Sequence, residues 1–132
     1  MDDIPEGEPM IAGMFSVNQH PTIILFDYGS SHSFISQTFA RKHEQKIVEL
    51  ECAYRISSAR ADLLTNEVVR GATLRIADRQ YDVTLIVMPS LVLDVIIGMN
   101  WMTKMGVMID TRNRTLTLKV PIGESTFQVV LP

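Results

Sequence analysis

Hydrophobic and polar residues alternate along much of the chain, and a period of two predicts β-strands rather than helices. The pattern is clearest at residues 72–77 and 81–88, which predict a hairpin that turns at residues 78–80. Other predicted strands lie at residues 10–17, 23–26, 47–56, 67–69, 91–97, 107–110, 115–120 and 127–131. Residues 18–21 and 57–66 have the polar composition of turns. Many short strands separated by turns are typical of a closed all-β domain.

Two segments depart from this strand pattern. Within residues 33–43, apolar residues four to five apart predict a helical turn, or a strand leading into one. Further along, Met99, Met102 and Met105 recur at every third position beside Trp101. This spacing favours a short helix packed on the core of the domain, because Met is a common filler of irregular core gaps. The alternative is an exposed, Met-rich binding surface.

The composition is that of an ordinary globular domain. The chain has 132 residues, of which 46% are hydrophobic and 20% charged, and this length is enough to bury a core. We assign the domain to residues 10–132. Residues 1–9 are acidic and contain two prolines, so we interpret them as a flexible tail or the remnant of a linker.

Charge and cysteine content limit the partners that we expect. A net charge of −3 with scattered arginines gives no basic surface for nucleic acid. No apolar run approaches the length of a membrane span and no signal peptide is visible, so we expect an intracellular, cytoplasmic protein with no membrane partner. The single cysteine, Cys52, cannot form an internal disulfide, which fits a reducing compartment.

The first candidate for chemistry follows the strand at residues 23–26, which ends abruptly in Asp27-Tyr28-Gly29-Ser30. Gly29 allows a sharp turn, and the hydroxyl groups of Ser30 and of Ser31, which follows it, offer hydrogen-bond donors near the Asp27 carboxylate. We therefore interpret this segment as an active-site turn. The alternative is an ordinary loop, because Asp, Gly and Ser are common turn residues.

Two other kinds of site are disfavoured. A Ser-His-Asp hydrolase would have to use Ser30, His32 and Asp27, but adjacent residues on an extended strand point to opposite faces, and no nucleophile-elbow pattern is present. A metal site is not predicted either, because His32 and His43 have no Cys or carboxylate partner at ligand spacing.

A second motif lies in residues 93–110, where another apolar strand ends in Ile97-Gly98-Met99-Asn100. The stretches FDYGSSHSFIS and LDVIIGMNWMTKMGVMID together resemble the retroviral and retrotransposon aspartic proteases, and most of all those of Ty3/gypsy elements. The resemblance extends over about residues 10–118. Two motifs in the right order and at the right distance are much more specific than either motif alone.

The resemblance implies an all-β fold, a closed retropepsin-like acid-protease barrel with one short C-terminal helix. In that barrel the two motifs lie side by side at the core. The implied catalytic residue is Asp27. The implied active-site turn consists of Tyr28, Gly29, Ser30 and Ser31, and the second core motif consists of Ile97, Gly98 and Asn100.

The resemblance also implies a flap, a hairpin that closes over the substrate and excludes water. Its residues would be Ser58, Ala59, Arg60, Ala61, Asp62 and Leu63. The family usually has glycine at the flap tip, whereas this chain has none between Gly29 and Gly71. The implied substrates are extended peptides, including the parent polyprotein, and the implied chemistry needs no metal or organic cofactor.

The chemistry of an aspartic protease needs two Asp carboxylates that share one proton. This chain has one Asp-x-Gly motif, and the other candidate, Asp110, has no glycine after it. The simpler solution is a symmetric homodimer in which each chain contributes Asp27. In the resembled retroviral enzymes the terminal strands of the two subunits interleave, and residues 127–131 are the candidate for that role here.

Tyr28 departs from the family motif, which has Thr or Ser between Asp and Gly. In the family this hydroxyl joins a hydrogen-bond network between subunits, and a hydroxyl at the end of a long ring cannot replace it at the same place. Tyr28 either points elsewhere and leaves the loop shape intact or marks a decayed copy.

The sequence as a whole leaves three interpretations. The chain is a dimeric aspartic endopeptidase of retrotransposon type, a non-catalytic retropepsin-like domain retained for binding or dimerisation, or a host-domesticated protease that acts on a cellular protein.

Overall fold

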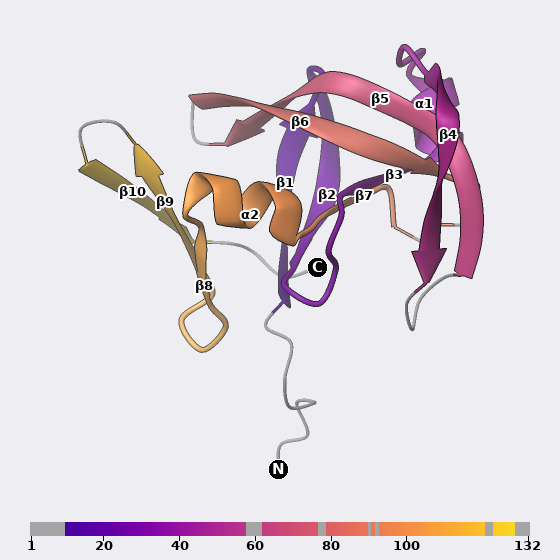
Figure 1. The fold of residues 1–132 in the computed structure, drawn as a ribbon. Helices are drawn as coiled ribbons and strands as arrows, with labels where there is room; N and C mark the ends of the chain where they lie inside the picture. Colours follow the sequence, from indigo (N-terminus) through magenta and orange to yellow (C-terminus); the bar gives the residue numbers. More distant parts are fainter. Residues whose placement is uncertain are drawn as a thin grey trace.

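Six strands form a closed barrel in the computed structural model (Figure 1). The structure describes residues 10–57, 62–76, 79–89, 91, 93–120 and 123–128. The strand order is β1-β2-β7-β3-β6-β5, and the barrel closes because β1 also pairs with β5. The bounds of these strands are β1 Met10–Val17, β2 His20–Asp27, β3 Phe34–Ser36, β5 Asp62–Ile76, β6 Arg79–Met88 and β7 Val95–Ile97. The predicted closed all-β barrel is confirmed.

Four further strands extend the barrel on two sides. Strand β4 (Val48–Ser57) pairs with β5 and forms a long hairpin with it. Strands β8 (Met108–Asp110), β9 (Thr115–Val120) and β10 (Gly123–Gln128) form a separate antiparallel sheet. In Figure 1 this sheet and β4 lie on opposite sides of the molecule. Strand β10 begins before the predicted strand at 127–131, and residues 129–131 lie outside the described residues, as do residues 1–9 of the predicted tail.

Two short helices accompany the strands in the described part of the chain, α1 (Gln37–Lys42) and α2 (Met99–Met105). Helix α2 is the predicted C-terminal helix, and its Trp101 and Met102 are buried as expected for a helix packed on the barrel. Helix α1 follows β3 directly, which confirms a strand leading into a helical turn. The expectation of one helix was therefore incomplete. No helix among the described residues has the length and apolar character to cross a membrane.

The segment at residues 62–76 is one long strand, whereas the sequence predicted a turn followed by two separate strands. Two features hide the strand. Thr65 is a polar residue that points inward, where its hydroxyl donates to the carbonyl of Val87 at 3.1 Å, while Leu64 is 63% exposed. Gly71, at φ 61°, lies where the register between β5 and β6 shifts, so the alternation changes phase there.

Other boundaries moved by a few residues. The turn between β1 and β2 contains Asn18 and Gln19, both at positive φ, and β2 begins at His20, inside the predicted turn at residues 18–21. Strand β6 begins at Arg79, inside the turn predicted at residues 78–80. The strand predicted at residues 91–97 is shorter, because β7 contains Val95–Ile97 alone.

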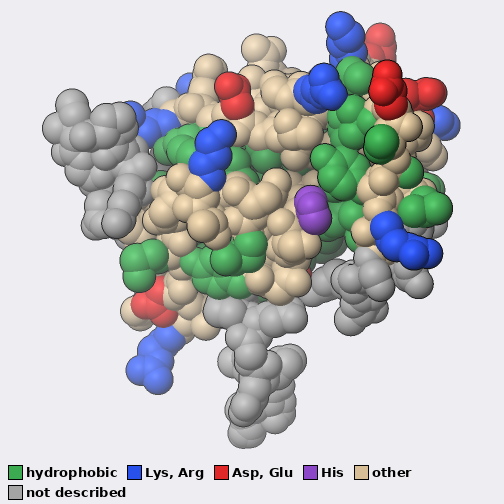
Figure 2. All heavy atoms as spheres, viewed as in Figure 1, with side chains coloured by type: hydrophobic (Ala, Val, Ile, Leu, Met, Phe, Trp, Pro, Cys, Tyr) green, Lys and Arg blue, Asp and Glu red, His purple; other side chains and the backbone are tan. Residues whose placement is uncertain are grey.

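Two hydrophobic clusters fill the interior. The larger cluster joins the barrel to α2 through residues such as Phe26, Ile97 and Trp101. The smaller cluster, which includes Phe34, Ile86 and Ile96, packs against the partly buried side chains of β4. Figure 2 shows hydrophobic side chains exposed on the side of the molecule where β4 lies, with basic and acidic side chains around them.

A pair of histidine rings links α1 to the turn between β1 and β2. The rings of His20 and His43 stack with their centroids 4.1 Å apart, and the Phe39 ring is tilted against His43 with a centroid distance of 4.5 Å. The pKa of His43 is held below its ordinary value, mainly because the ring is partly buried and to a smaller extent because His20 and Lys42 lie nearby. The carboxylate of Asp94 acts in the opposite direction and raises the pKa. The folded state therefore favours the neutral His43 ring.

The lowered pKa of His43 predicts how stability changes with pH. The unfolded chain binds a proton at His43 more readily than the folded chain. The contribution of the neutral His43 ring to the free energy of unfolding is therefore present above about pH 6.5 and is lost as the pH falls. We expect the urea midpoint to decrease between about pH 7 and pH 5.5, and to decrease less in His43→Gln. An NMR titration that gives His43 a pKa above its ordinary value would contradict this explanation.

Candidate active site

Asp27 is the last residue of β2 and is buried, with 1% of its surface exposed. The backbone N–H of Gly29 donates to its Oδ1 at 2.8 Å, and the N–H of Ser30 donates to its carbonyl at 3.1 Å. These two bonds close a tight turn directly after the strand. One carboxylate oxygen is therefore fixed by the backbone that follows it.

The second motif packs against this turn because β7 runs parallel to β2, with Phe26 paired to Ile97. The next residue, Gly98, then passes so close to the turn that a Cβ atom would lie 2.1 Å from the carbonyl oxygen of His32 and 2.5 Å from that of Ser30. Real Cβ atoms do not approach other atoms this closely. Only glycine fits at this position, and the structure brings the two predicted motifs together.

Backbone and side-chain hydrogen bonds join the two motifs around Gly98. The N–H groups of Met99 and Asn100 donate to the carbonyls of Ser30 and Ser31, at 2.7 and 3.2 Å. The buried hydroxyl of Ser33 accepts from the N–H of Gly98 at 3.0 Å and donates to Oδ1 of Asn100 at 2.8 Å. Helix α2 is therefore anchored at its first turn to the Asp27 turn.

Ser33 was missed by the sequence analysis, which named Ser30 and Ser31 among the site residues. The hydroxyl of Ser30 donates to the carbonyl of His32 at 2.8 Å and so stabilises the turn itself. Ser33 directly precedes Phe34, the first residue of the buried strand β3, and is itself buried. Its place next to a short apolar run was the one indication in the sequence that its hydroxyl could be buried. Its partners lie more than sixty positions away in sequence, so the bonds themselves could not be predicted.

His32 lies between the Asp27 turn and β4. Its Nδ1 is 2.9 Å from Oγ of Ser31, and its ring meets the Tyr54 ring at 67°, with centroids 5.6 Å apart. The hydroxyl of Ser30 donates to the backbone carbonyl of His32 and not to the His32 ring. Ser30, His32 and Asp27 therefore do not form the relay of a serine hydrolase.

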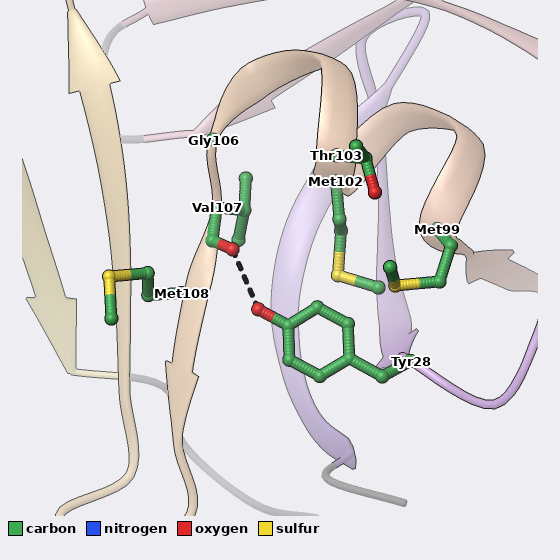
Figure 3. Close-up of a pocket in the computed structure, with 7 residues that line it drawn as sticks. All are labelled: Tyr28, Met99, Met102, Thr103, Gly106, Val107 and Met108. Carbon is green, nitrogen blue, oxygen red and sulfur yellow. Dashed lines mark hydrogen bonds between the residues drawn. The ribbon is translucent and has the colours of Figure 1, made fainter.

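The Tyr28 side chain extends from the turn toward the end of α2. Its hydroxyl donates to the carbonyl of Val107 at 2.6 Å, and its ring packs against the larger hydrophobic cluster (Figure 3). It borders an open hollow of about 470 Å³. The other residues that line this hollow are Met99, Met102, Thr103, Gly106, Val107 and Met108.

Asp110 serves the turn between β8 and β9. Its Oδ1 accepts from the N–H groups of Arg112 and Asn113, and its Oδ2 accepts from the side chain of Asn113. The hydrogen bonds from Asn113 hold the pKa of this exposed carboxyl below its ordinary value. Its carboxylate is therefore engaged in a surface turn and is not part of the Asp27 turn.

The predicted flap falls at the end of the β4–β5 hairpin. Ser57 and Asp62 pair at its base, and Asp62 and Leu63 belong to β5. Ser58, Ala59, Arg60 and Ala61 lie outside the described residues, so the flap stays a prediction. Within the described part of the chain, no three His, Cys, Asp or Glu side chains are grouped as ligands for a metal ion.

The sequence matches a family model described as retroviral aspartyl protease over residues 1–124. No curated protein sequence matches it significantly. Among solved structures, it is similar to the retroviral protease-like domain of Ddi1 from Leishmania major, with 16% identity, a TM-score of 0.66, and coverage of 89% of this chain and 94% of that one.

Two other solved structures have the same fold. For the EIAV protease complexed with the inhibitor HBY-793, identity is 14% and the TM-score 0.61, over 83% of this chain and 99% of that chain. For a retropepsin-like aspartic protease from Rickettsia conorii, identity is 18% and the TM-score 0.53, over 79% and 85%.

The close approach at Gly98 predicts that Gly98→Ala is much more damaging than an alanine at another glycine. The new Cβ must displace two backbone carbonyls, and we expect a loss of about 3 kcal/mol or more in the free energy of unfolding. Gly71→Ala is the matched control. Gly71 has φ 61° but no atom within 4 Å of an added Cβ, so backbone strain of roughly 1–2 kcal/mol is its expected cost. Equal urea midpoints for the two variants would contradict this account.

Proposed function

The chain belongs to the retroviral aspartyl protease family, and we propose that it is an aspartic endopeptidase that acts as a homodimer with one catalytic residue, Asp27, in each chain. The observation that carries this proposal is the Asp27 turn. A buried carboxylate ends a barrel strand, and its orientation is fixed by the Gly29 N–H. The turn is itself held by the backbone of Gly98 and Met99.

The need for a second carboxylate supports the homodimer. In this chemistry one Asp takes a proton from a bound water while the other donates a proton to the scissile carbonyl oxygen. The one alternative that the sequence offered within the chain, Asp110, is engaged in the turn between β8 and β9. A two-fold axis that brings two Asp27 carboxylates together supplies the pair without any other residue.

We further propose that the substrate is an extended peptide bound between the Asp27 turn and the β4–β5 hairpin. The ring contact between His32 and Tyr54 supports this placement, because it joins the turn to β4. The resemblance of both motifs to Ty3/gypsy proteases favours the parent polyprotein as the natural substrate. The mechanism uses side chains and water alone and has no step for a metal or organic cofactor.

A non-catalytic domain is the second candidate function. The observation that favours it is Tyr28, whose hydroxyl bonds to Val107 of its own chain instead of standing as a short hydroxyl beside Asp27. In that case the fold is retained for dimerisation or for binding a peptide, and the Asp27 turn has no chemical role.

The decisive assay is cleavage of a diverse peptide library between about pH 4 and 7, where two carboxylates that share a proton are singly protonated. We expect cleavage to rise more than linearly with protein concentration, because the dimer is the active species. Asp27→Asn should reduce kcat/KM by about a thousand-fold or more, since it removes the group that exchanges protons.

The matched control is Asp110→Asn, which makes the same chemical change at the surface turn and should retain cleavage. Cleavage that persists in Asp27→Asn would contradict the proposed role of Asp27. If the wild type and Asp27→Asn are both inert while both fold and dimerise, the second candidate function holds instead.

A further inference from the structure

The hydroxyl of Tyr28 connects two parts of the chain that are far apart in sequence. It donates to the carbonyl of Val107 at 2.6 Å, across 79 positions. Tyr28 follows Asp27 directly, and Val107 lies just after α2. A bond at this place therefore acts on the residue next to the proposed catalytic carboxylate.

The acceptor is itself rigidly held. Helix α2 ends at Met105 and is capped by Gly106, which has the left-handed conformation with φ 65° and ψ 36°. The N–H of Val107 donates to the carbonyl of Met102 at 2.9 Å. Together with the bond from the Gly106 N–H to Thr103, this arrangement is a Schellman motif. The side chain of Val107 is buried as well. The carbonyl that receives the Tyr28 hydroxyl thus has a fixed position relative to α2.

The Tyr28 ring adds a second contact with the same helix. The ring is half-buried, packs against the larger hydrophobic cluster and lines the hollow with Met99 and Met102 (Figure 3). A tyrosine ring fixed by packing at its faces and by a hydrogen bond at its tip has little freedom to rotate. The turn is consequently held at both ends of α2, by Gly98 at the start of the helix and by the bond from Tyr28 to Val107 just after its end.

We propose that Tyr28 is a positioning residue that holds the Asp27 turn against α2 from within its own chain. The inference rests on the proposed function, because it assigns Tyr28 a role in placing the proposed catalytic carboxylate. Loss of the hydroxyl leaves the fold in place, since water in the open hollow can replace it at the Val107 carbonyl. The turn then gains freedom, and small displacements of reacting groups have large effects on rate.

The test compares Tyr28→Phe with Tyr81→Phe. Tyr81 also packs on α2, with its ring edge-on to Trp101 at a centroid distance of 5.5 Å, but its buried hydroxyl has no hydrogen-bond partner among the described residues. Both variants lose one hydroxyl beside the same helix. Only Tyr28→Phe loses a hydrogen bond that joins the Asp27 turn to the residue after α2.

At protein concentrations that saturate dimer formation, we expect Tyr28→Phe to lower kcat about ten-fold with KM changed by less than about two-fold. The dimer dissociation constant should be unchanged, and Tyr81→Phe should match the wild type in both kinetic constants. An unchanged kcat in Tyr28→Phe overturns the proposal. So does a loss that disappears at higher protein concentration, because the hydroxyl would then act in subunit association.

Amide exchange supplies a readout that does not depend on catalysis. The Gly29 N–H, which is bonded to Oδ1 of Asp27, should exchange about ten-fold faster in Tyr28→Phe than in the wild type, and not in Tyr81→Phe. If the wild type is inert, the proposed function fails. Faster exchange at Gly29 in Tyr28→Phe would then still show that Tyr28 holds the Asp27 turn, but this role would not serve catalysis. Equal exchange at Gly29 in all three proteins would overturn the proposal that Tyr28 holds the Asp27 turn.

Discussion

The close packing of Gly98 against the carbonyls of Ser30 and His32 is the contact on which the candidate site depends. It exists because β2 and β7 run side by side and in parallel, so that the two strands end at the same level. The first turn of α2 then bonds back to the Asp27 turn. The conformation of a turn near the start of the chain is thus set by a segment about seventy positions later.

Much of this architecture follows from the sequence. Alternating strands and polar turns predicted a closed all-β domain. The resemblance carried by the two motifs, in their order and at their distance, implied that they meet at its core. Helix α2 was predicted from the spacing of Met99, Met102 and Met105 beside Trp101. The strands and the helix depend on local periodicity and on residue types with few conformational alternatives, so they can be inferred without knowledge of the tertiary fold.

The remaining features depend on contacts between distant segments. Strand β5 is continuous although Thr65 points inward, because β6 supplies the carbonyl that accepts its hydroxyl. Ser33 belongs to the candidate site because the fold places Gly98 and Asn100 within hydrogen-bond distance of its hydroxyl. From the sequence, Tyr28 could either point elsewhere and leave the loop shape intact or mark a decayed copy, and its partner at Val107 could not be predicted. Side-chain partners across the barrel are decided by tertiary packing, not by spacing along the chain.

The proposed catalytic pair takes a single Asp27 from each of two chains. The most direct measurement mixes wild type and Asp27→Asn at constant total protein, allows the subunits to exchange, and records the cleavage rate. If only wild-type homodimers are active, an equal mixture should retain about one quarter of the wild-type rate, and the rate should follow the square of the wild-type fraction. A rate of about one half, in linear proportion to that fraction, would show that each chain acts alone and would contradict the claim.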